Sequence, residues 1–528
     1  MLTSSEFKLL GIAGVGFFLD AYDLFVINPV ATMLQYRLYG GHSLPANLEG
    51  FVKAGANIGS VIGQFLFGYL ADALGRKAIY GKELMLIIFA TILTMTTPTG
   101  SLSPNQCLIY LGIFRIILGI GVGGDYPMSA SVTSDRSNLR KRGTMLAYIF
   151  SNQGWGSLLG SVVTIIVLAC YKHVMDVEGK TSKVDGVWRI VIGVSLIPAF
   201  GTLYQRLTLP ESNRFIASQK LKNATSAAEE ATSPSTKKET EKDSKHLTDS
   251  PTSTVANDEP SQDNEKEKEN GRSHFRDFVI YFSEWRHAKI LIGTCVCWFL
   301  LDVAFYGINL NQNVVLQQIG YDGKTGTAWH RMFKISTGNI IITALGFVPG
   351  YWVSVLTIEI MGRKWIQIQG FLLAALFLAV LAGKFTTLST AGFIVCFAFL
   401  QVRYFLPLPL ISLVIRRAEL TTHPRSSSST GAQILPHTVT PPKALFPTRY
   451  RATAHGLSAA FGKLGAIVSA LAFNTLTKKI GTPAVLWIFF GCCIAGAGFT
   501  LLLPEVKGRD PDLVLAEEMR EAREQLPG

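Results

Sequence analysis

Charged residues inside long apolar runs are the positions of this 528-residue chain that could do chemistry. Arg115 and Asp125 share one such run, which includes the Gly-rich stretch LGIGVGGDYPMSASVTSD at residues 118–135. A charge inside a bilayer is costly and usually marks an ion or substrate path. We therefore expect these two charges to serve transport. The alternative is a structural Arg115–Asp125 ion pair beside glycines that let helices pack closely.

A second constellation is Trp298, Asp302 and Tyr306, spaced i, i+4, i+8 and hence on one face of a helix. Trp and Tyr donate hydrogen bonds, whereas an ionised aspartate only accepts them and would repel an anion. Protonation of Asp302 would remove that repulsion and add a donor, so a proton and an oxyanion would bind together. The alternative is a buried aspartate that is hydrogen-bonded to a neighbouring helix.

Two further apolar runs carry one polar residue each that suits an anion. Gln153 offers an amide donor, and Lys463 is too deep in its run to reach the interface easily. Lys463 could therefore balance an anion or act as the counterion of Asp302. Lys53 lies near a span end, where it could face the interior or the interface.

The composition indicates a polytopic membrane protein. Of all residues, 48% are hydrophobic and 16% are charged, against about a quarter charged in soluble domains. The net charge of +12 resides mostly in loops, which fits the positive-inside rule better than nucleic-acid binding. The seven cysteines show no metal-ligand spacing, so we expect no metal, disulfide or other cofactor.

The apolar runs predict about twelve membrane spans and an all-α fold. The expected spans are 7–34, 48–74, 78–98, 106–133, 143–170, 187–208, 287–318, 332–360, 365–385, 389–418, 451–477 and 482–503. These predict a six-helix bundle at 1–216, a linker loop at 217–285, a second six-helix bundle at 286–504 and a tail at 505–528. The linker is polar and cannot bury a core, and its Ser/Thr-Pro sites suggest regulation by kinases or ubiquitin machinery.

The two halves repeat each other. Both Asp72-Ala-Leu-Gly-Arg76-Lys and Glu359-Ile-Met-Gly-Arg363-Lys read acid-x-x-Gly-Arg-Lys, at an offset of 287 (363 − 76). A parallel repeat of six spans places substrate sites near the bilayer midplane between the halves. These basic loops should be cytoplasmic, and so should both termini and the linker. Asp72, Arg76, Glu359 and Arg363 are candidate gate residues, although a purely topogenic role is an equal alternative.

The stretch GIGVGGDYPMSASVTSD closely resembles the fourth-helix signature of fungal and plant phosphate:proton symporters of the major facilitator superfamily, roughly GIGIGGDYPLSATIxSE. Met128 replaces Leu and Asp135 replaces Glu. The resemblance implies the major facilitator fold, a plasma-membrane location and phosphate binding by Tyr126, Gln153, Trp298, Asp302, Tyr306 and Lys463. It also implies that Arg115, Asp125 and Asp302 take part in proton movement, joined by the first-helix pair Asp20 and Asp23. Glu83 matches the family too, with a surface role as the alternative.

The chain departs from this family pattern at residues 402–443. The tenth helix of the family contains a Gly-Pro-Asn turn whose asparagine contributes to the phosphate site, and neither is present here. An atypical insertion or replacement is therefore expected at 402–443. Two explanations are possible. Either the predicted coding sequence retains an intron, or the chain is a divergent paralogue.

The sequence therefore favours a proton-coupled importer of inorganic phosphate that works by alternating access and is not an enzyme. Two alternatives remain. The first is another major facilitator porter, for sugars or organic anions. The second is a phosphate-sensing receptor or non-transporting paralogue, and the unusual tenth span supports this hypothesis. The partners expected are phosphate, protons and the lipid bilayer.

Overall fold

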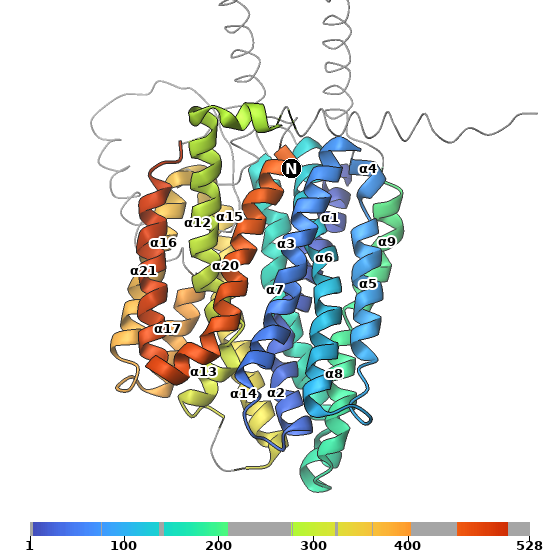
Figure 1. Cartoon of the computed structure of the whole chain (residues 1–528). Helices are drawn as coiled ribbons and strands as arrows, with labels where there is room; N and C mark the ends of the chain where they lie inside the picture. The colour runs from blue at the N-terminus through green and yellow to red at the C-terminus, as the bar shows by residue number, and fades with distance from the viewer. Residues whose placement is uncertain are drawn as a thin grey trace, which may run out of the picture.

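The computed structural model describes residues 4–74, 76–136, 142–209, 276, 278–322, 326–361, 363–402 and 451–504. The elements in these ranges are helices that run side by side as one bundle (Figure 1). This architecture follows from the long apolar runs, because a chain inside a bilayer must satisfy its backbone hydrogen bonds internally. Within the described ranges, ten helical stretches are long and apolar enough to cross a membrane.

The first half of the chain forms the helices drawn from blue to green in Figure 1. They are α1 (Ser4–Phe25), α2 (Ile27–Leu38), α3 (Ala46–Ala73), α4 (Arg76–Ile79), α5 (Lys82–Met95), α6 (Pro104–Arg136), α7 (Arg142–Cys170), α8 (Val184–Gly193) and α9 (Leu196–Leu207), with short turns η1 (His173–Val177) and η2 (Thr181–Lys183) before α8.

The second half forms the helices drawn from light green to red. They are α12 (Trp285–Asn309), α13 (Gln312–Gln318), α14 (Ala328–Ile342), η3 (Thr343–Phe347), α15 (Val348–Met361), α16 (Arg363–Gly383), α17 (Thr390–Val402), α20 (Arg451–Ile480) and α21 (Thr482–Thr500). The ten long apolar stretches account for ten of the twelve predicted spans. The remaining two predicted spans are represented by α3 and by the shorter apolar stretch Thr390–Gln401.

Several predicted spans are interrupted rather than continuous. The span at 287–318 ends as α12 at Asn309 and resumes as the separate helix α13. The residues at this break are polar, and the side chains of Asn309 and Asn311 turn back onto the helix: their amides donate to the carbonyls of Phe305 and Gly307. Side chains that compete for backbone groups in this way favour the end of a helix.

Close helix contacts hold the first half together. Gly55, Gly59 and Gly63 form a stripe on α3 that packs against the glycines of α6. A Cβ on Gly59 would lie 1.9 Å from the carbonyl oxygen of Ile116, and one on Gly123 would lie 2.4 Å from that of Ser60. Only residues without a side chain allow backbones to approach this closely. This packing holds α6, which carries Asp125 and Tyr126, at a fixed depth in the bundle.

The halves meet through α3 with α20 and through α7 with α14, η3 and α15. The N-terminus, the end of α9 and the start of α12 lie at one end of the bundle, drawn at the top of Figure 1. The predicted linker at 217–285, for the most part, lies outside the described residues. The atypical segment, apart from Val402, and the tail at 505–528 lie outside them as well.

Candidate functional site

The centre of the site is the ammonium group of Lys463 on α20. Its Nζ donates a hydrogen bond to the hydroxyl of Tyr306 and lies 3.9 Å from Oδ2 of Asp302, both on α12. It also lies over two aromatic rings, 4.1 Å from the centroid of Tyr306 and 5.2 Å from that of Tyr126. Lys463 is only 3% exposed, so its amino group is held inside the bundle by π-faces and one carboxylate.

Hydrogen bonds run from Tyr126, whose ring faces this lysine, across to α7 and α15. Nε2 of Gln153 donates to the hydroxyl of Tyr126 at 2.5 Å, and the hydroxyl of Tyr351 donates to Oε1 of Gln153 at 3.0 Å. Gln153 and Tyr126 belong to the first half and Tyr351 to the second. These hydrogen bonds therefore link the two halves at the level of the lysine.

Trp298 completes the face of α12 that the sequence predicted. Its indole is 5% exposed and packs against the ring of His455 on α20, with the centroids 5.4 Å apart. A Cβ on Gly462 would lie 2.6 Å from Cδ1 of Trp298 and 3.0 Å from Oδ2 of Asp302. The glycine before Lys463 thus lets α20 lie directly against this face.

Five of the predicted anion-binding residues therefore come together between the halves, and the sixth, Trp298, lies one turn from Asp302 on α12. Their types suit a tetrahedral oxyanion: one ammonium, two phenol hydroxyls, an indole N–H, an amide and a carboxyl group that becomes a donor when it is protonated. The central site is defined here as Tyr126, Gln153, Trp298, Asp302, Tyr306 and Lys463. Sequence reasoning did not single out Tyr351, because one tyrosine in an apolar run carries no signal of its own.

A buried ionic cluster lies beside this site on α5, α6 and α9. Arg206 binds Asp125 with both amino groups, Nη1 to Oδ1 at 2.9 Å and Nη2 to Oδ2 at 3.1 Å, and Nη1 also donates to Oε1 of Glu83 at 3.2 Å. Ser129 donates a further hydrogen bond to Asp125. The side chains of Arg206 and Glu83 are fully buried and that of Asp125 is 1% exposed.

The Arg206 cluster corrects one sequence-based alternative. The carboxylate of Asp125 is paired with Arg206 and not with Arg115, which lies ten residues, or about 15 Å, away along the same continuous helix. Arg115 instead donates from Nε to the carbonyl of Val52 at 3.1 Å and from Nη1 to the backbone carbonyl of Asp23 at 3.2 Å. Arg115 and Asp125 therefore lie in different parts of the bundle.

Asp20 is a further buried carboxylate of the first half, on α1. It is fully buried, and within the described residues neither oxygen of its carboxylate has a hydrogen-bond partner. The charges of Asp125, Arg206 and Lys463 all act on it. Gly16, one turn earlier on α1, packs on the cluster so tightly that a Cβ would lie 1.9 Å from Nη2 of Arg206 and 2.0 Å from Oδ2 of Asp125.

The four predicted gate residues fall at helix ends. Asp72 is in the last turn of α3, Arg76 begins α4, Glu359 is near the end of α15 and Arg363 begins α16. Their side chains lie outside the part of the structure that is described, so their role as gates stays a prediction.

Comparison with known proteins shows which family the chain belongs to. A family described as "sugar (and other) transporter" matches residues 9–427 and 434–515, and the break between these ranges falls inside the atypical segment 402–443. The chain belongs to this transporter family.

Relatives within the family share most of their length with this chain. It is 42% identical to a putative inorganic phosphate transporter of Schizosaccharomyces pombe, over 97% of this chain and 88% of that protein. It is 36% identical to the inorganic phosphate transporter PHO84 of Saccharomyces cerevisiae, over 95% and 83%. It is 34% identical to the repressible high-affinity phosphate permease of Neurospora crassa, over 95% and 84%.

Solved structures show the same fold. The proton:xylose symporter XylE of the major facilitator superfamily, bound to 6-bromo-6-deoxy-D-glucose, aligns with a TM-score of 0.67 at 19% identity, covering 98% of this chain and 100% of that one. An inward-open structure of XylE from E. coli aligns with a TM-score of 0.61 at 18% identity, over 97% and 99%. The predicted major facilitator fold is confirmed.

Proposed function

We propose that this chain imports inorganic phosphate together with protons across the plasma membrane by alternating access of its two halves. The observation that carries the proposal is the buried ammonium of Lys463, set among donors from both halves. The names of the relatives point to the same substrate. A carrier without covalent chemistry needs only such a site and two gates.

In this proposal phosphate binds against Lys463 and the hydroxyls of Tyr306 and Tyr126. The lysine supplies the opposite charge, and charge-assisted hydrogen bonds to it are about twice as strong as neutral ones. Asp302, 3.9 Å from Nζ of Lys463, would repel phosphate while it is ionised. Protonation of Asp302 removes that repulsion and frees Lys463 for the anion, which couples the two bound species.

Proton transfer in this proposal uses the acidic residues of the first half. Asp20, whose carboxylate interacts with the charges of Asp125, Arg206 and Lys463, would receive a proton from Asp302 or pass one on. Asp125 and Glu83 together carry one more charge than Arg206 balances, so the cluster can hold one proton at no net charge. Asp23 and Arg115 would complete the route away from this cluster.

The proposed orientation has both termini and the 217–285 loop in the cytoplasm. The acid-x-x-Gly-Arg-Lys repeats support it through the positive-inside rule. In the same proposal, 1–216 and 286–504 are the two moving bundles, Asp72, Arg76, Glu359 and Arg363 latch the cytoplasmic gate, and kinases or ubiquitin machinery act on the loop.

The test is phosphate uptake in cells that lack their own phosphate transporters. Uptake should be faster at acid external pH, should stop with a protonophore, and should fall at least about tenfold in Asp302→Asn, because the variant cannot exchange a proton. Glu284→Gln is the matched carboxylate-to-amide control, since Glu284 is exposed at the start of α12. It should transport normally.

Two results would contradict the proposal. Normal uptake by Asp302→Asn with unchanged pH dependence would remove the coupling mechanism. No phosphate uptake by wild type that is correctly localised would favour a receptor.

A further inference from the structure

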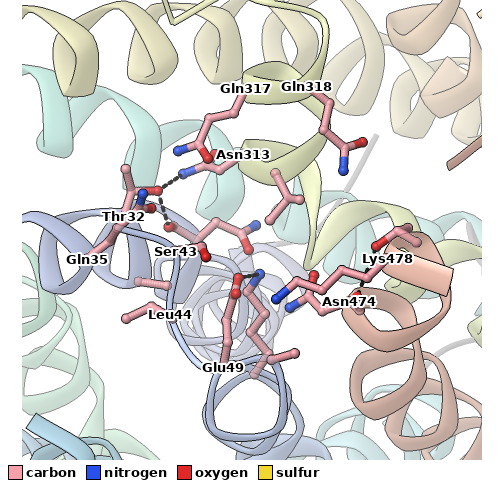
Figure 2. A pocket seen from close by; sticks show the side chains of 16 residues that line it. Thr32, Gln35, Ser43, Leu44, Glu49, Asn313, Gln317, Gln318, Asn474 and Lys478 are labelled. Atoms are coloured by element: carbon pink, nitrogen blue, oxygen red, sulfur yellow. Dashed lines mark hydrogen bonds and ion pairs between the residues drawn. The ribbon is translucent and has the colours of Figure 1, made fainter. Parts of the chain in front are cut away.

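A polar cavity separate from the central site, called the second cavity here, lies between the halves at the end of the bundle opposite the N-terminus. Its volume is about 330 Å³, within the usual range for ligand pockets of about 300–1,000 Å³. It is walled by α2 and α3 of the first half and by α13 and α20 of the second (Figure 2). None of the six residues of the central site lines it.

The charges that face this cavity sum to one positive charge. Lys53 is 2% exposed and donates from Nζ to Oε1 of Glu49 at 2.5 Å and to Oδ1 of Asn311 at 3.0 Å. Lys478, on the last turn of α20, points into the cavity from the other half (Figure 2). Two lysines against one glutamate favour an anion inside it.

The cavity also holds amide groups that lack partners. Asn474 is 5% exposed, and within the described residues its Nδ2 has no hydrogen-bond partner. Oδ1 of Asn28 likewise has none, although its Nδ2 donates to the carbonyl of Asn309 at 2.6 Å. Buried polar atoms without partners are costly, so both point to a bound species that accepts from one amide and donates to the other.

An inorganic phosphate that carries a proton has this property, because it offers both acceptor oxygens and a hydroxyl donor. The hydroxyl also allows contact with Glu49, which would repel a fully ionised anion. Asn28, which lines the cavity, donates to the carbonyl of Asn309 on α12, and Asn309 lies seven residues, or about 10 Å, along that helix from Asp302 of the central site.

We propose that this cavity is a second phosphate subsite, formed by Lys53, Lys478 and Asn474, which holds the anion before it reaches Lys463. This inference rests on the proposed function. It adds a binding site of its own, which raises the local phosphate concentration at the entrance in the manner of charged clefts.

The test is equilibrium binding of radiolabelled inorganic phosphate to the full-length protein in nanodiscs. Wild type should bind phosphate at two sites. Lys463→Ala removes the central site and should leave one weaker site. In this background Lys478→Glu should weaken the remaining binding at least about fivefold, as expected for a lost attraction of about 1 kcal/mol in water.

Lys479→Glu is the matched control. Lys479 is the next residue of α20, is exposed and does not line the cavity, so the same charge reversal should leave binding unchanged. Lys53→Gln tests the buried lysine and should also weaken binding at least about fivefold. Thermal unfolding of each variant checks that it is folded.

The outcomes separate the two proposals. If wild type binds phosphate but Lys463→Ala binds none, the second subsite is wrong and the importer stands. If residual binding is insensitive to Lys478→Glu and Lys53→Gln, the subsite is equally wrong. If wild type binds no phosphate at all, the proposed function fails and takes the subsite with it.

Discussion

Arg206 binds two buried carboxylates, and its single positive charge balances one of them. Removing one partner of a buried ion pair costs about 3–5 kcal/mol, because the charge left behind is uncompensated. Asp125 and Glu83 both depend on the same guanidinium. Gly16 forms the α1 side of this cluster, and its lack of a side chain lets α1 pack directly against Arg206 and Asp125.

At the residue scale, Gly16→Ala should disrupt the Arg206 cluster. The added methyl would lie 1.9 Å from Nη2 of Arg206 and 2.0 Å from Oδ2 of Asp125, so one of them must move. We expect a cost of about 1–3 kcal/mol for overpacking. Phosphate uptake and thermal unfolding are measured, and we expect uptake to be lost and the midpoint of unfolding to fall.

Gly11→Ala is the control on the same helix, because nothing lies within 4 Å of a Cβ there. It should keep wild-type uptake and stability. Equal behaviour of the two variants would show that the Arg206–Asp125 geometry has no part in transport.

The central site and the Arg206 cluster differ in how far the sequence predicts them. Asp302, Tyr306 and Lys463 stand out because each interrupts an apolar run, and helical spacing puts the first two on one face. Arg206 lies at the end of its run, where arginines usually reach the interface. Its pairing with Glu83 depends on which helices pack together, and no local pattern encodes that.

At the element scale, α3 and α6 form one packed unit through their glycines. Gly59→Ala should separate them, because the methyl would lie 1.9 Å from the carbonyl oxygen of Ile116, a backbone atom that cannot rotate away. We expect a cost of about 3 kcal/mol or more, above the usual range for overpacking. Thermal unfolding of the purified protein measures it.

Gly201→Ala in α9 is the matched control. Its position is exposed and a Cβ there would meet nothing within 4 Å, so stability should stay the same or rise slightly through the better helix propensity of alanine. A Gly59→Ala variant as stable as this control would mean that the backbones of α3 and α6 leave room for a methyl group at this position.

The elements themselves were largely predictable, because twelve apolar runs of sufficient length can only become helices in a bilayer. The breaks were not. The run at 287–318 is apolar enough to be drawn as one span, yet α12 ends at Asn309 because asparagine amides bind their own backbone there. Hydropathy averages over such residues, so it misses the turn that places α13 at the mouth of the second cavity.

At the scale of the whole molecule, the two halves are joined near the second cavity by side-chain contacts that a rocking motion must break. Nδ2 of Asn313 on α13 donates to Oγ1 of Thr32 on α2 at 2.8 Å. Both residues line the cavity (Figure 2), so a small reagent that enters it can reach them. This pair reports directly on whether the halves separate during transport.

Thr32→Cys with Asn313→Cys, joined by a short bifunctional methanethiosulfonate that forms a disulfide with each cysteine, should therefore stop phosphate uptake, and a reductant that cleaves these disulfides should restore it. The background carries Cys170→Ser, because Cys170 is exposed. Tyr39→Cys with Asn105→Cys is the control: the hydroxyl of half-buried Tyr39 donates to Oδ1 of exposed Asn105 at 2.6 Å, and both residues belong to the first half. A cross-link there moves with its bundle and should leave uptake intact. If the cross-link between the halves were equally harmless, the two bundles would not rock against each other at this end, and the alternating-access mechanism would need another moving part.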